Sequence, residues 1–470
     1  MKRTLALILS LLMMVSIFAA CSSKTAQSPD TSTPPADTAT NTPAEAESSE
    51  DGSSEKKQIT MWFWGAATDY QAAMKRILCG WYNNSQDEYE LSIEFRNTVD
   101  VDIPRALAAG NAPDIVYASG PSYTATYVQE GLVMNLDAYS EQYGWKDRVL
   151  GAMYDSLTVA GSLYSTPGGM CVGGLFYNKE LFAEKGWEVP TTWDEMLALF
   201  EDVQAAGIYP LGAGNKGWKP CNDHFSSMII NHAGGAGLFY DALTGKTSFN
   251  TPEMVAAVQT SADWYSAGYL SGEDYVNLDS QEVMQLLGDK RCAMVMAPTL
   301  YIQFAGQLEQ SQQDSIGFAP MPSATTEEAV YDLSINCNFS INAATPYADE
   351  CAKILDYMLT ADYVGQMTEA WPGYWAVPIK DIVSYDASSM TGMSRLTMDA
   401  VQNAIVQIDK GYFAFHPSTF FPSATVTAFE DVDTVWQGVM TAEQFCSAVA
   451  AELDAERADG AVVPLAEPAK

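Results

Sequence analysis

Short apolar segments alternate with capped helical segments along most of this chain, and this alternation constrains its fold more than any other feature. Segments suited to buried strands occur at residues 59–64, 91–95, 114–117, 175–177, 292–296, 316–319 and 338–342. Helix starts stand between them, with capping residues at Thr192, Thr251, Asp279 or Ser280, Thr345 and Thr441. Alternating strands and helices are typical of α/β proteins. We therefore predict an α/β fold with mainly parallel sheets, and a body of about 400 residues favours two lobes over one core.

Residues 1–20 have the pattern of a secretory signal peptide. Lys2 and Arg3 precede an apolar run from Leu5 to Phe18, which is shorter than the about 20 residues that a membrane-spanning helix needs. The sequence FAAC at residues 18–21 resembles a bacterial lipobox. This resemblance implies that Cys21 is lipidated and anchors the mature protein to the outer face of the cell membrane. The alternative is an ordinary cleaved signal followed by an incidental cysteine.

Residues 21–57 are predicted to form a tether. Beyond Cys21 the segment consists largely of Ser, Thr, Pro, Ala, Asp and Glu, and it contains no aromatic residue. Such a segment buries too little apolar surface to offset the entropy lost on ordering. We expect it to be disordered, so that the folded body can reach a membrane partner.

Charge and cysteine content exclude several classes of protein. The formal net charge of −35 repels phosphate backbones and anionic lipids, so we expect no nucleic-acid partner and no polybasic membrane patch. Without Cys21, seven widely spaced cysteines remain and none forms a C-x-x-C motif, which argues against a disulfide framework or a zinc ribbon. Most are expected to be buried apolar residues. No metalloprotease, serine-hydrolase or EF-hand motif is present, so we predict no metal and no cofactor.

Several ordered motifs carry a family resemblance. They are ITMWFW at 59–64, LAAGNAPDI at 107–115, GLVMNL at 131–136, LYSTP at 163–167, LFYNKELF at 175–182, PTTWDE at 190–195 and GDKRCAM at 288–294. Together they resemble the sugar-binding family of ABC-transporter extracellular solute-binding proteins, which includes maltose-binding protein. The resemblance runs with gaps from about Ile59 to Leu453.

The resemblance implies a fold, a function and partners. The fold is a two-lobed periplasmic-binding-protein-like fold with hinge crossovers and an interlobe cleft. Residues 58–170 and 318–360 form its N-terminal lobe, and residues 171–317 and 361–460 form its C-terminal lobe. The function is extracytoplasmic capture of a carbohydrate, preferably an oligosaccharide, and its delivery to the permease subunits of an ABC importer. The protein is expected to be a monomer and not an enzyme.

A site for neutral sugars needs flat aromatic surfaces together with side chains that donate and accept hydrogen bonds. By resemblance, the loops that line the cleft carry Trp64, Ser119, Gly120, Tyr123, Trp218, Asp223, His224, Tyr301 and Asn338, with Asn336 beside the last. For Trp64 the alternative is a core position on an edge strand.

The densest aromatic cluster is WPGYW at residues 371–375. Three large rings around a Pro-Gly turn are expected to leave at least one ring exposed, and an exposed aromatic indicates a binding surface. We predict that Trp371, Tyr374 and Trp375 contribute to the site, with Trp371 or Trp375 facing the ligand. Phe420 and Phe421 form a second, weaker aromatic candidate.

Two other kinds of function remain open. A tethered glycoside hydrolase would need two carboxylates across the scissile bond, and the acidic content of the chain does not exclude such a pair. Alternatively, the same fold can bind a non-sugar solute or supply a membrane sensor. An anionic solute would call for clustered Arg or Lys, which the candidate loops lack.

Overall fold

The computed structural model describes residues 55–216 and 220–469, without the side chains of residues 220–223 and Ser418. Cys21, Trp218 and the side chain of Asp223 lie outside the described residues, and the predictions made for them stay predictions.

The predicted strand segments all overlap strands of the structure, and 114–117 and 338–342 each extend one residue beyond the strand. The strands are β1 Lys57–Trp64, β2 Tyr89–Arg96, β3 Ile115–Ala118, β4 Thr158–Val159, β5 Ser162–Leu163, β6 Thr166–Asn178, β7 Tyr209–Leu211, β8 Cys292–Pro298, β9 Ile316–Ala319, β10 Tyr331–Ile341 and β11 Phe413–Phe415. Of these, β4, β5, β7 and β11 were not predicted. They are two or three residues long, too short to show a pattern of alternation.

The main sheet has the strand order β2-β1-β3-β10-β6-β8-β7, with β11 paired to β10 and β9 paired to β6. The pairs β1–β2, β1–β3, β7–β8 and β10–β11 are parallel. The pairs of β10 with β3 and β6, and of β6 with β8 and β9, are antiparallel. The prediction of mainly parallel sheets is therefore wrong, because β6 and β10 run against most of their neighbours.

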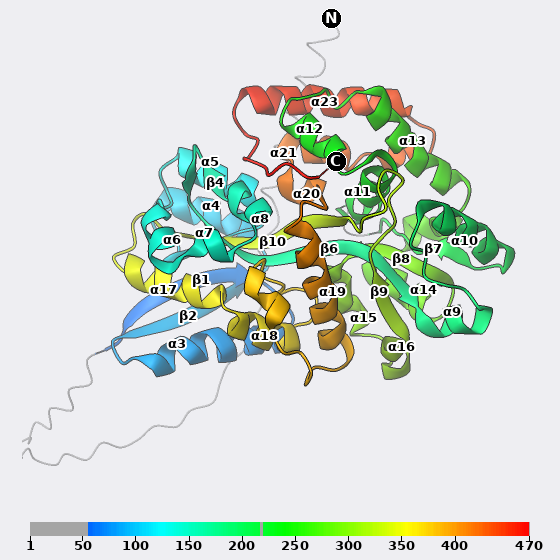
Figure 1. Cartoon of the computed structure of the whole chain (residues 1–470). Helices are drawn as coiled ribbons and strands as arrows, with labels where there is room; N and C mark the ends of the chain where they lie inside the picture. The colour runs from blue at the N-terminus through cyan, green and yellow to red at the C-terminus, as the bar shows by residue number, and fades with distance from the viewer. Residues whose placement is uncertain (1–54, 217–219, 470) are drawn as a thin grey trace, which may run out of the picture. The chain divides into compact units, whose positions relative to one another are not determined.

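Strand β6 connects the two halves of this sheet. Residues 166–172 pair with β10, and residues 173–177 pair with β8. Neither Gly173 nor Gly174 has room for a side chain at this transition, since a Cβ on Gly174 would lie 2.4 Å from the Phe318 ring. In Figure 1, β6 and β10 cross the middle of the body, with β1, β2 and α17 on one side and β7, β8 and α14 on the other.

Helices cover both faces of the sheet. The α-helices are α2 Thr68–Met74, α3 Gly80–Ser85, α4 Val99–Ala109, α5 Pro121–Gln129, α6 Asp137–Tyr143, α7 Trp145–Arg148, α8 Gly151–Ser156, α9 Lys179–Lys185, α10 Trp193–Ala205, α11 Pro220–Gly234, α12 Gly237–Leu243, α13 Pro252–Ser266, α14 Ser280–Gly288, α15 Ile302–Ala305, α16 Gln310–Ser315, α17 Ala348–Met358, α18 Ala361–Ala370, α19 Gly392–Ile408, α20 Pro417–Phe420, α21 Ser423–Phe429, α22 Asp433–Trp436 and α23 Ala442–Ala458. The π-helix is η1 Lys75–Cys79, and the 3₁₀ helices are η2 Gly272–Asn277, η3 Thr299–Tyr301 and η4 Lys380–Ser384.

Four predicted helix starts are confirmed by their hydrogen bonds. The side chains of Thr192, Thr251, Asp279 and Thr441 each accept a hydrogen bond from the backbone N–H three residues further on. Each such cap is worth about 1 kcal/mol. These caps fix where α10, α13, α14 and α23 begin.

The predicted helix start at Thr345 is wrong, because α17 begins at Ala348. The Thr345 hydroxyl donates instead to Asp114 Oδ1 at 2.6 Å. Asp114 Oδ2 also accepts from the backbone N–H and the hydroxyl of Thr60, both at 2.8 Å. The carboxylate of the NAPD motif therefore joins β1, β3 and the segment before α17, which makes it a structural residue.

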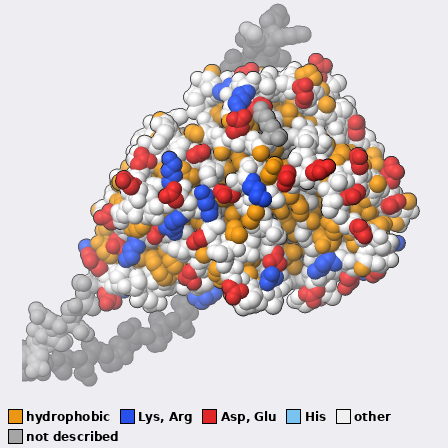
Figure 2. Space-filling view, viewed as in Figure 1, with side chains coloured by type: hydrophobic (Ala, Val, Ile, Leu, Met, Phe, Trp, Pro, Cys, Tyr) orange, Lys and Arg blue, Asp and Glu red, His pale blue; other side chains and the backbone are white. Residues whose placement is uncertain are grey.

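The described cysteines Cys79, Cys171, Cys292, Cys337, Cys351 and Cys446 are buried free thiols, which confirms the prediction for these residues. Burial raises the pKa of the Cys79 and Cys171 thiols to about 11. Within the described residues, no helix combines the length and the hydropathy needed to cross a membrane. On the face shown in Figure 2, Asp and Glu side chains are spread over the surface with Lys and Arg side chains between them.

Candidate functional site

A cavity of about 640 Å³ lies where the carboxyl ends of β1, β2 and β3 meet elements of the other half of the sheet. Open α/β sheets place their ligand sites at this edge. The lining residues are Trp64, Gly65, Asn97, Val99, Asp100, Tyr117, Ser119, Tyr123, His224, Pro298, Leu300, Gln303, Phe304, Ser334, Ile335, Asn336, Tyr374, Thr419, Val426 and Glu430. Segments from both halves of the sheet therefore contribute to the wall of one cavity.

An aromatic cluster forms one side of this cavity. Trp64 is half-buried at the end of β1, and its indole N–H donates to the Tyr374 hydroxyl at 2.7 Å. Tyr374 is 4% exposed and its ring stacks on Trp371, with 4.6 Å between ring centroids. The hydrogen bond holds Trp64 in place at the cavity wall, where an apolar sugar face can rest against it.

The prediction that Trp371 or Trp375 is exposed is wrong, since both are 0% exposed and neither lines the cavity. Tyr70 of α2 stacks on Trp371 with ring centroids 4.6 Å apart, and Phe63 of β1 stacks on Trp375 at 5.6 Å. These rings come from distant segments and cover the faces that a turn alone would leave open. Trp371 and Trp375 therefore support Trp64 and Tyr374 from behind.

A polar wall faces the aromatic cluster. The Ser119 hydroxyl donates to Asp100 Oδ1 at 2.5 Å and lies 2.8 Å from the Tyr117 hydroxyl. Tyr123, on the first turn of α5, is 44% exposed. Gly120 lies behind this wall, and a Cβ there would sit 3.3 Å from the Thr419 carbonyl oxygen. Its role is close contact between lobes, so Ser119 and Tyr123 reach the cavity while Gly120 does not line it.

His224 lies at the wall of the cavity, and Tyr301 lies behind it. His224 on α11 lines the cavity although it is only 4% exposed. The Tyr301 hydroxyl lies 3.3 Å from His224 Nδ1 and accepts from the Ser280 hydroxyl at 3.1 Å. Tyr301 itself is 0% exposed and does not line the cavity, so the prediction that it faces the ligand does not match its position. It orients His224 from behind.

Asn336 and Asn338 have different surroundings. Asn336 lines the cavity and donates to the Tyr374 carbonyl oxygen at 2.9 Å. Asn338 is 0% exposed, lies outside the cavity lining and donates to the Thr124 hydroxyl at 2.6 Å. The structure therefore places Asn336 at the site and Asn338 in the packing beneath α5.

The sequence interpretation missed several residues of the cavity wall. Asn97 and Asp100 follow β2 as Ser119 follows β3, so the ends of the predicted strands could have identified them. Gln303 and Glu430 carried no comparable signal, because they are brought in by tertiary packing. Among the described residues, the lining contains the carboxylates of Asp100 and Glu430 and no Lys or Arg. This composition disfavours an anionic ligand.

The burial of His224 predicts a pH dependence of stability. Burial lowers the pKa of His224 from 6.5 to about 3. Between these two pH values the His224 imidazole is protonated in the unfolded chain and neutral in the folded chain. The resulting stability is complete above pH 6.5 and is lost as the pH falls towards about 3, by about 1.4 kcal/mol per pH unit for this group. Urea unfolding of the wild type and His224→Gln across this range measures the difference in slope. His416, whose pKa burial also lowers, remains in both proteins, so a difference between them comes from His224. Equal slopes of unfolding free energy against pH in the two proteins would contradict the account.

Among the described residues, no cluster of three or more His, Cys, Asp or Glu is arranged to hold a metal ion. The groups that the cavity lining offers a ligand are aromatic faces, hydroxyls, amides and carboxylates.

Comparison with known proteins places this site in a family. A family model described as bacterial extracellular solute-binding protein matches residues 92–365. A multiple sugar-binding protein of Streptococcus mutans is 21% identical over 320 residues, which cover 66% of this chain and 73% of the relative. A probable sugar-binding periplasmic protein of Brucella melitensis is 27% identical over 126 residues, which cover 27% of this chain but only 30% of the relative.

Solved structures share the fold. The sugar-binding protein MalE from Xanthomonas citri has a TM-score of 0.70 at 13% identity, covering 86% of this chain and 98% of that protein. A protein from Caldanaerobius polysaccharolyticus, solved in work on xylan utilization, has a TM-score of 0.68 at 21% identity and covers 84% of this chain and 99% of that protein. The fold is thus the two-lobed one of these neighbours. With the family model spanning more than half of its length, this chain belongs to the bacterial extracellular solute-binding proteins.

Proposed function

We propose that this protein captures a neutral carbohydrate, preferably an oligosaccharide, outside the cytoplasm and delivers it to an ABC importer. The observation that carries the proposal is the interlobe cavity, in which Trp64 and Tyr123 stand among hydroxyl, amide and carboxylate groups and whose described lining holds no Lys or Arg. Aromatic faces suit the C–H surfaces of sugars, and the polar groups suit their hydroxyls. The sugar-binding names of the relatives support the same ligand class.

Capture works through the two lobes. Closure around a ligand is the usual hinge motion of such folds, and a ligand shifts the equilibrium only by its difference in affinity for the open and closed states. Residues 58–170 with 318–360 are assigned to one lobe and residues 171–317 with 361–460 to the other. Within the second set, residues 371–375 pack against Phe63, Trp64 and Tyr70 and so stay with the first lobe. A sugar that contacts Trp64 on one lobe and His224 on the other favours closure, and the closed protein binds the permease.

The remaining parts of the proposal concern the context of the folded body. Cys21 carries the lipid anchor on the outer face of the cell membrane, residues 22–57 form the tether, and the protein acts as a monomer without cofactor or catalytic activity. The relatives are named as binding proteins, which supports a binding role. Release of reducing sugar from any oligosaccharide would instead indicate the hydrolase alternative.

A thermal-shift panel of mono- and oligosaccharides tests the proposed ligand class. At a free concentration of about 100 times its Kd, a bound sugar stabilises the native state by about 2.7 kcal/mol and raises the melting temperature. Glucose 6-phosphate is the matched control, and we expect no shift with it because no Lys or Arg of the described residues lines the cavity. A shift with sugar phosphates and none with neutral sugars would contradict the proposal.

A further inference from the structure

A second cavity, of about 530 Å³, adjoins the first. Its walls are α5, the segment 421–427 and the end of α23. Tyr123 and Val426 line both cavities. One wall also continues along the chain, since Ser119 lines the first cavity and Ser122 the second. The two cavities therefore adjoin, with Tyr123 and Val426 at their junction.

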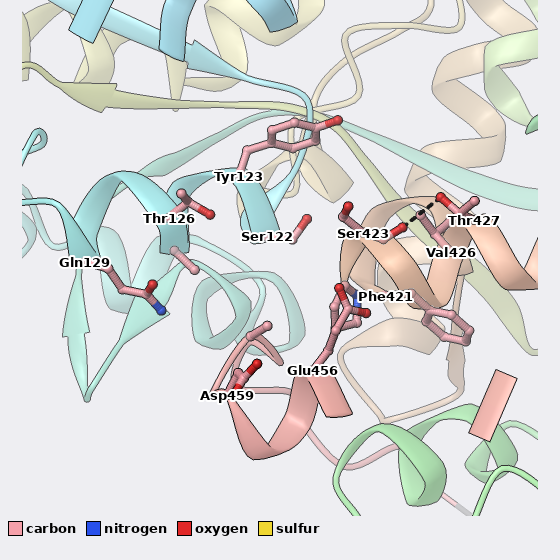
Figure 3. A pocket seen from close by; sticks show the side chains of 13 residues that line it. Ser122, Tyr123, Thr126, Gln129, Phe421, Ser423, Val426, Thr427, Glu456 and Asp459 are labelled. Atoms are coloured by element: carbon pink, nitrogen blue, oxygen red, sulfur yellow. Dashed lines mark hydrogen bonds between the residues drawn. The ribbon is translucent and has the colours of Figure 1, made fainter. Parts of the chain in front are cut away.

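The second cavity offers polar groups that the protein leaves unused. Among the described residues, the side chains of Ser122, Thr126, Gln129 and Ser423 make no hydrogen bond within the protein, yet all four line this cavity. Figure 3 shows Ser122 on α5 and Ser423 on α21 on opposite sides of the space. Hydroxyls and an amide can both donate and accept hydrogen bonds, as the hydroxyls of a sugar require.

The wall formed by α21 is held in place from behind. Glu456 of α23 accepts hydrogen bonds from the backbone N–H groups of Ala424 and Thr425, both at 2.8 Å, and from the Thr425 hydroxyl at 2.7 Å. This carboxylate satisfies free N–H groups at the start of α21. The wall that carries Ser423 and Thr427 is thus fixed before any ligand binds, which lowers the entropic cost of binding.

The charge of the second cavity selects the same class of ligand as the first. Glu456 and Asp459 line it, and no Lys or Arg does. A phosphate, sulfate or uronate group would meet carboxylates without a cation to pair with. The exposed ring of Tyr123 adds aromatic surface next to the hydroxyls, which suits a neutral sugar ring.

We propose that the second cavity binds the further units of an oligosaccharide whose first units occupy the interlobe cavity, with the Tyr123 ring at the junction between them. This inference rests on the proposed function and deepens it, because it states that the ligand is a chain long enough to pass Tyr123. The protein then prefers neutral oligosaccharides to the mono- or disaccharides of the same linkage.

The test compares affinity along a series of increasing chain length. Calorimetric titrations with the malto-, xylo- and chito-oligosaccharides, from the shortest members to the hexasaccharides, are made on the whole protein. Thr126→Trp fills the second cavity from an exposed position on α5, and Ser423→Trp does so from the opposite wall. Glu130→Trp adds the same ring at an exposed position that lines neither cavity.

We expect the two cavity variants to weaken the binding of long oligosaccharides and not that of short sugars. Thr126→Trp and Ser423→Trp weaken the longest bound oligosaccharide by about tenfold or more and change the shortest bound sugar by less than about twofold, whereas Glu130→Trp changes neither by more than that. Affinities that do not rise with length in the wild type, or equal losses at every length in the two cavity variants, overturn this inference alone. Absence of binding by every sugar overturns the proposed function as well.

Discussion

Replacing Asp332 by asparagine lowers the free energy of unfolding by about 1.5–3 kcal/mol, the contribution expected of buried hydrogen bonds to a charged group. Asp332 is 2% exposed, and its Oδ2 lies 2.8 Å from Nε2 of His232, which is 1% exposed. Such a loss is a large part of the about 5–15 kcal/mol that stabilises a typical domain. Urea unfolding at neutral pH measures it.

The surroundings of this pair explain why even an isosteric change is costly. Asp332 Oδ1 accepts from Asn231 Nδ2 at 2.5 Å, and Oδ2 faces the His232 ring. The new amide keeps one oxygen that can accept from Asn231, and its NH₂ group then meets His232 Nε2, which accepts only in the tautomer with the proton on Nδ1. The change therefore replaces hydrogen bonds to a charged carboxylate by weaker neutral ones. His232 Nδ1 also lies 3.1 Å from the Pro322 carbonyl oxygen, so both ring nitrogens of His232 face acceptors. The network ties α11 to the connection between β9 and β10.

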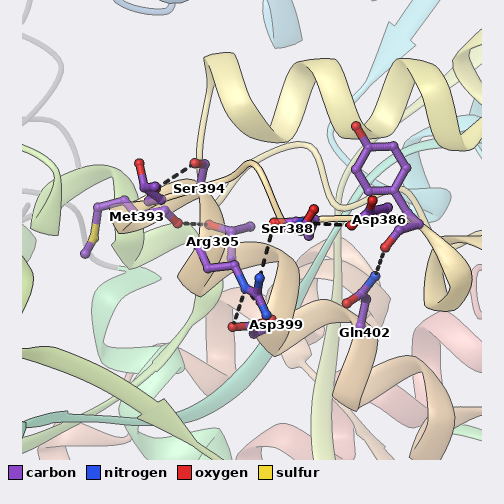
Figure 4. A network of polar contacts seen from close by, with 11 residues as sticks. Asp386, Ser388, Met393, Ser394, Arg395, Asp399 and Gln402 are labelled. Atoms are coloured by element: carbon purple, nitrogen blue, oxygen red, sulfur yellow. Dashed lines mark hydrogen bonds and ion pairs between the residues drawn. The ribbon is translucent and has the colours of Figure 1, made fainter.

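Asp399→Asn is the matched control, because it removes the same charge from an exposed pair. Arg395 Nε donates to both carboxylate oxygens of Asp399 at 2.9 Å, and this pair lies on the surface of α19 (Figure 4). Exposed pairs contribute little to stability because water and salt screen them. We expect no measurable change in this control, and a loss as large as that of Asp332→Asn would contradict the importance given to burial.

Trp64→Ala is expected to weaken binding of the sugar found by the thermal-shift panel by about thirtyfold or more, since truncating a tryptophan at a binding hot spot costs at least about 2 kcal/mol. Trp64 lines the cavity and its indole is fixed by Tyr374. Its loss removes the aromatic face and leaves the Tyr374 hydroxyl without this donor. Isothermal titration calorimetry of the two proteins measures the ratio of affinities.

Trp62→Ala is the control that distinguishes the loss of a contact with the sugar from a loss of stability. Trp62 lies two residues earlier on β1, so both side chains point to the same face of the strand. Trp62 is half-buried like Trp64, but it lies outside the cavity lining and packs against the Arg96 guanidinium, 3.4 Å from the ring centroid. We expect Trp62→Ala to keep the wild-type affinity. An equal loss of affinity in both variants would place the binding site elsewhere.

The strands and caps were predictable because their signals are local. A threonine cap such as Thr192 acts within one turn, and a buried strand such as β8 shows its apolar run directly. The direction of β6 and β10 has no local signal, since it depends on which strands pair. The sheet was therefore predicted as mainly parallel and proved mixed.

The aromatic cluster shows how tertiary packing overrides a local argument. The turn at residues 371–375 by itself cannot cover three rings, yet Phe63 and Tyr70 pack against Trp375 and Trp371 from about 300 residues earlier in the chain. The burial of Trp371 could not follow from the turn sequence. Trp64, in contrast, was identified by the family resemblance, which places the loop after the first strand at the cleft, and it lies at the end of β1.

Asn336 and Asn338 show a second limit of sequence patterns. Both were considered because of the family resemblance, and residues two apart on a regular strand would share a face. The register of β10 against β6 shifts between Ile335 and Cys337 and again between Cys337 and Asn338. Such irregularities re-aim side chains, and only Asn336 reaches the cavity.

A crystal structure of the protein with its tightest-binding neutral oligosaccharide tests the central claim most directly. The account predicts sugar density between the lobes, with one ring against Trp64 and polar contacts to the wall that carries Asp100 and Ser119. Density for the sugar outside this cavity, with the space beside Trp64 filled only by water, would contradict it.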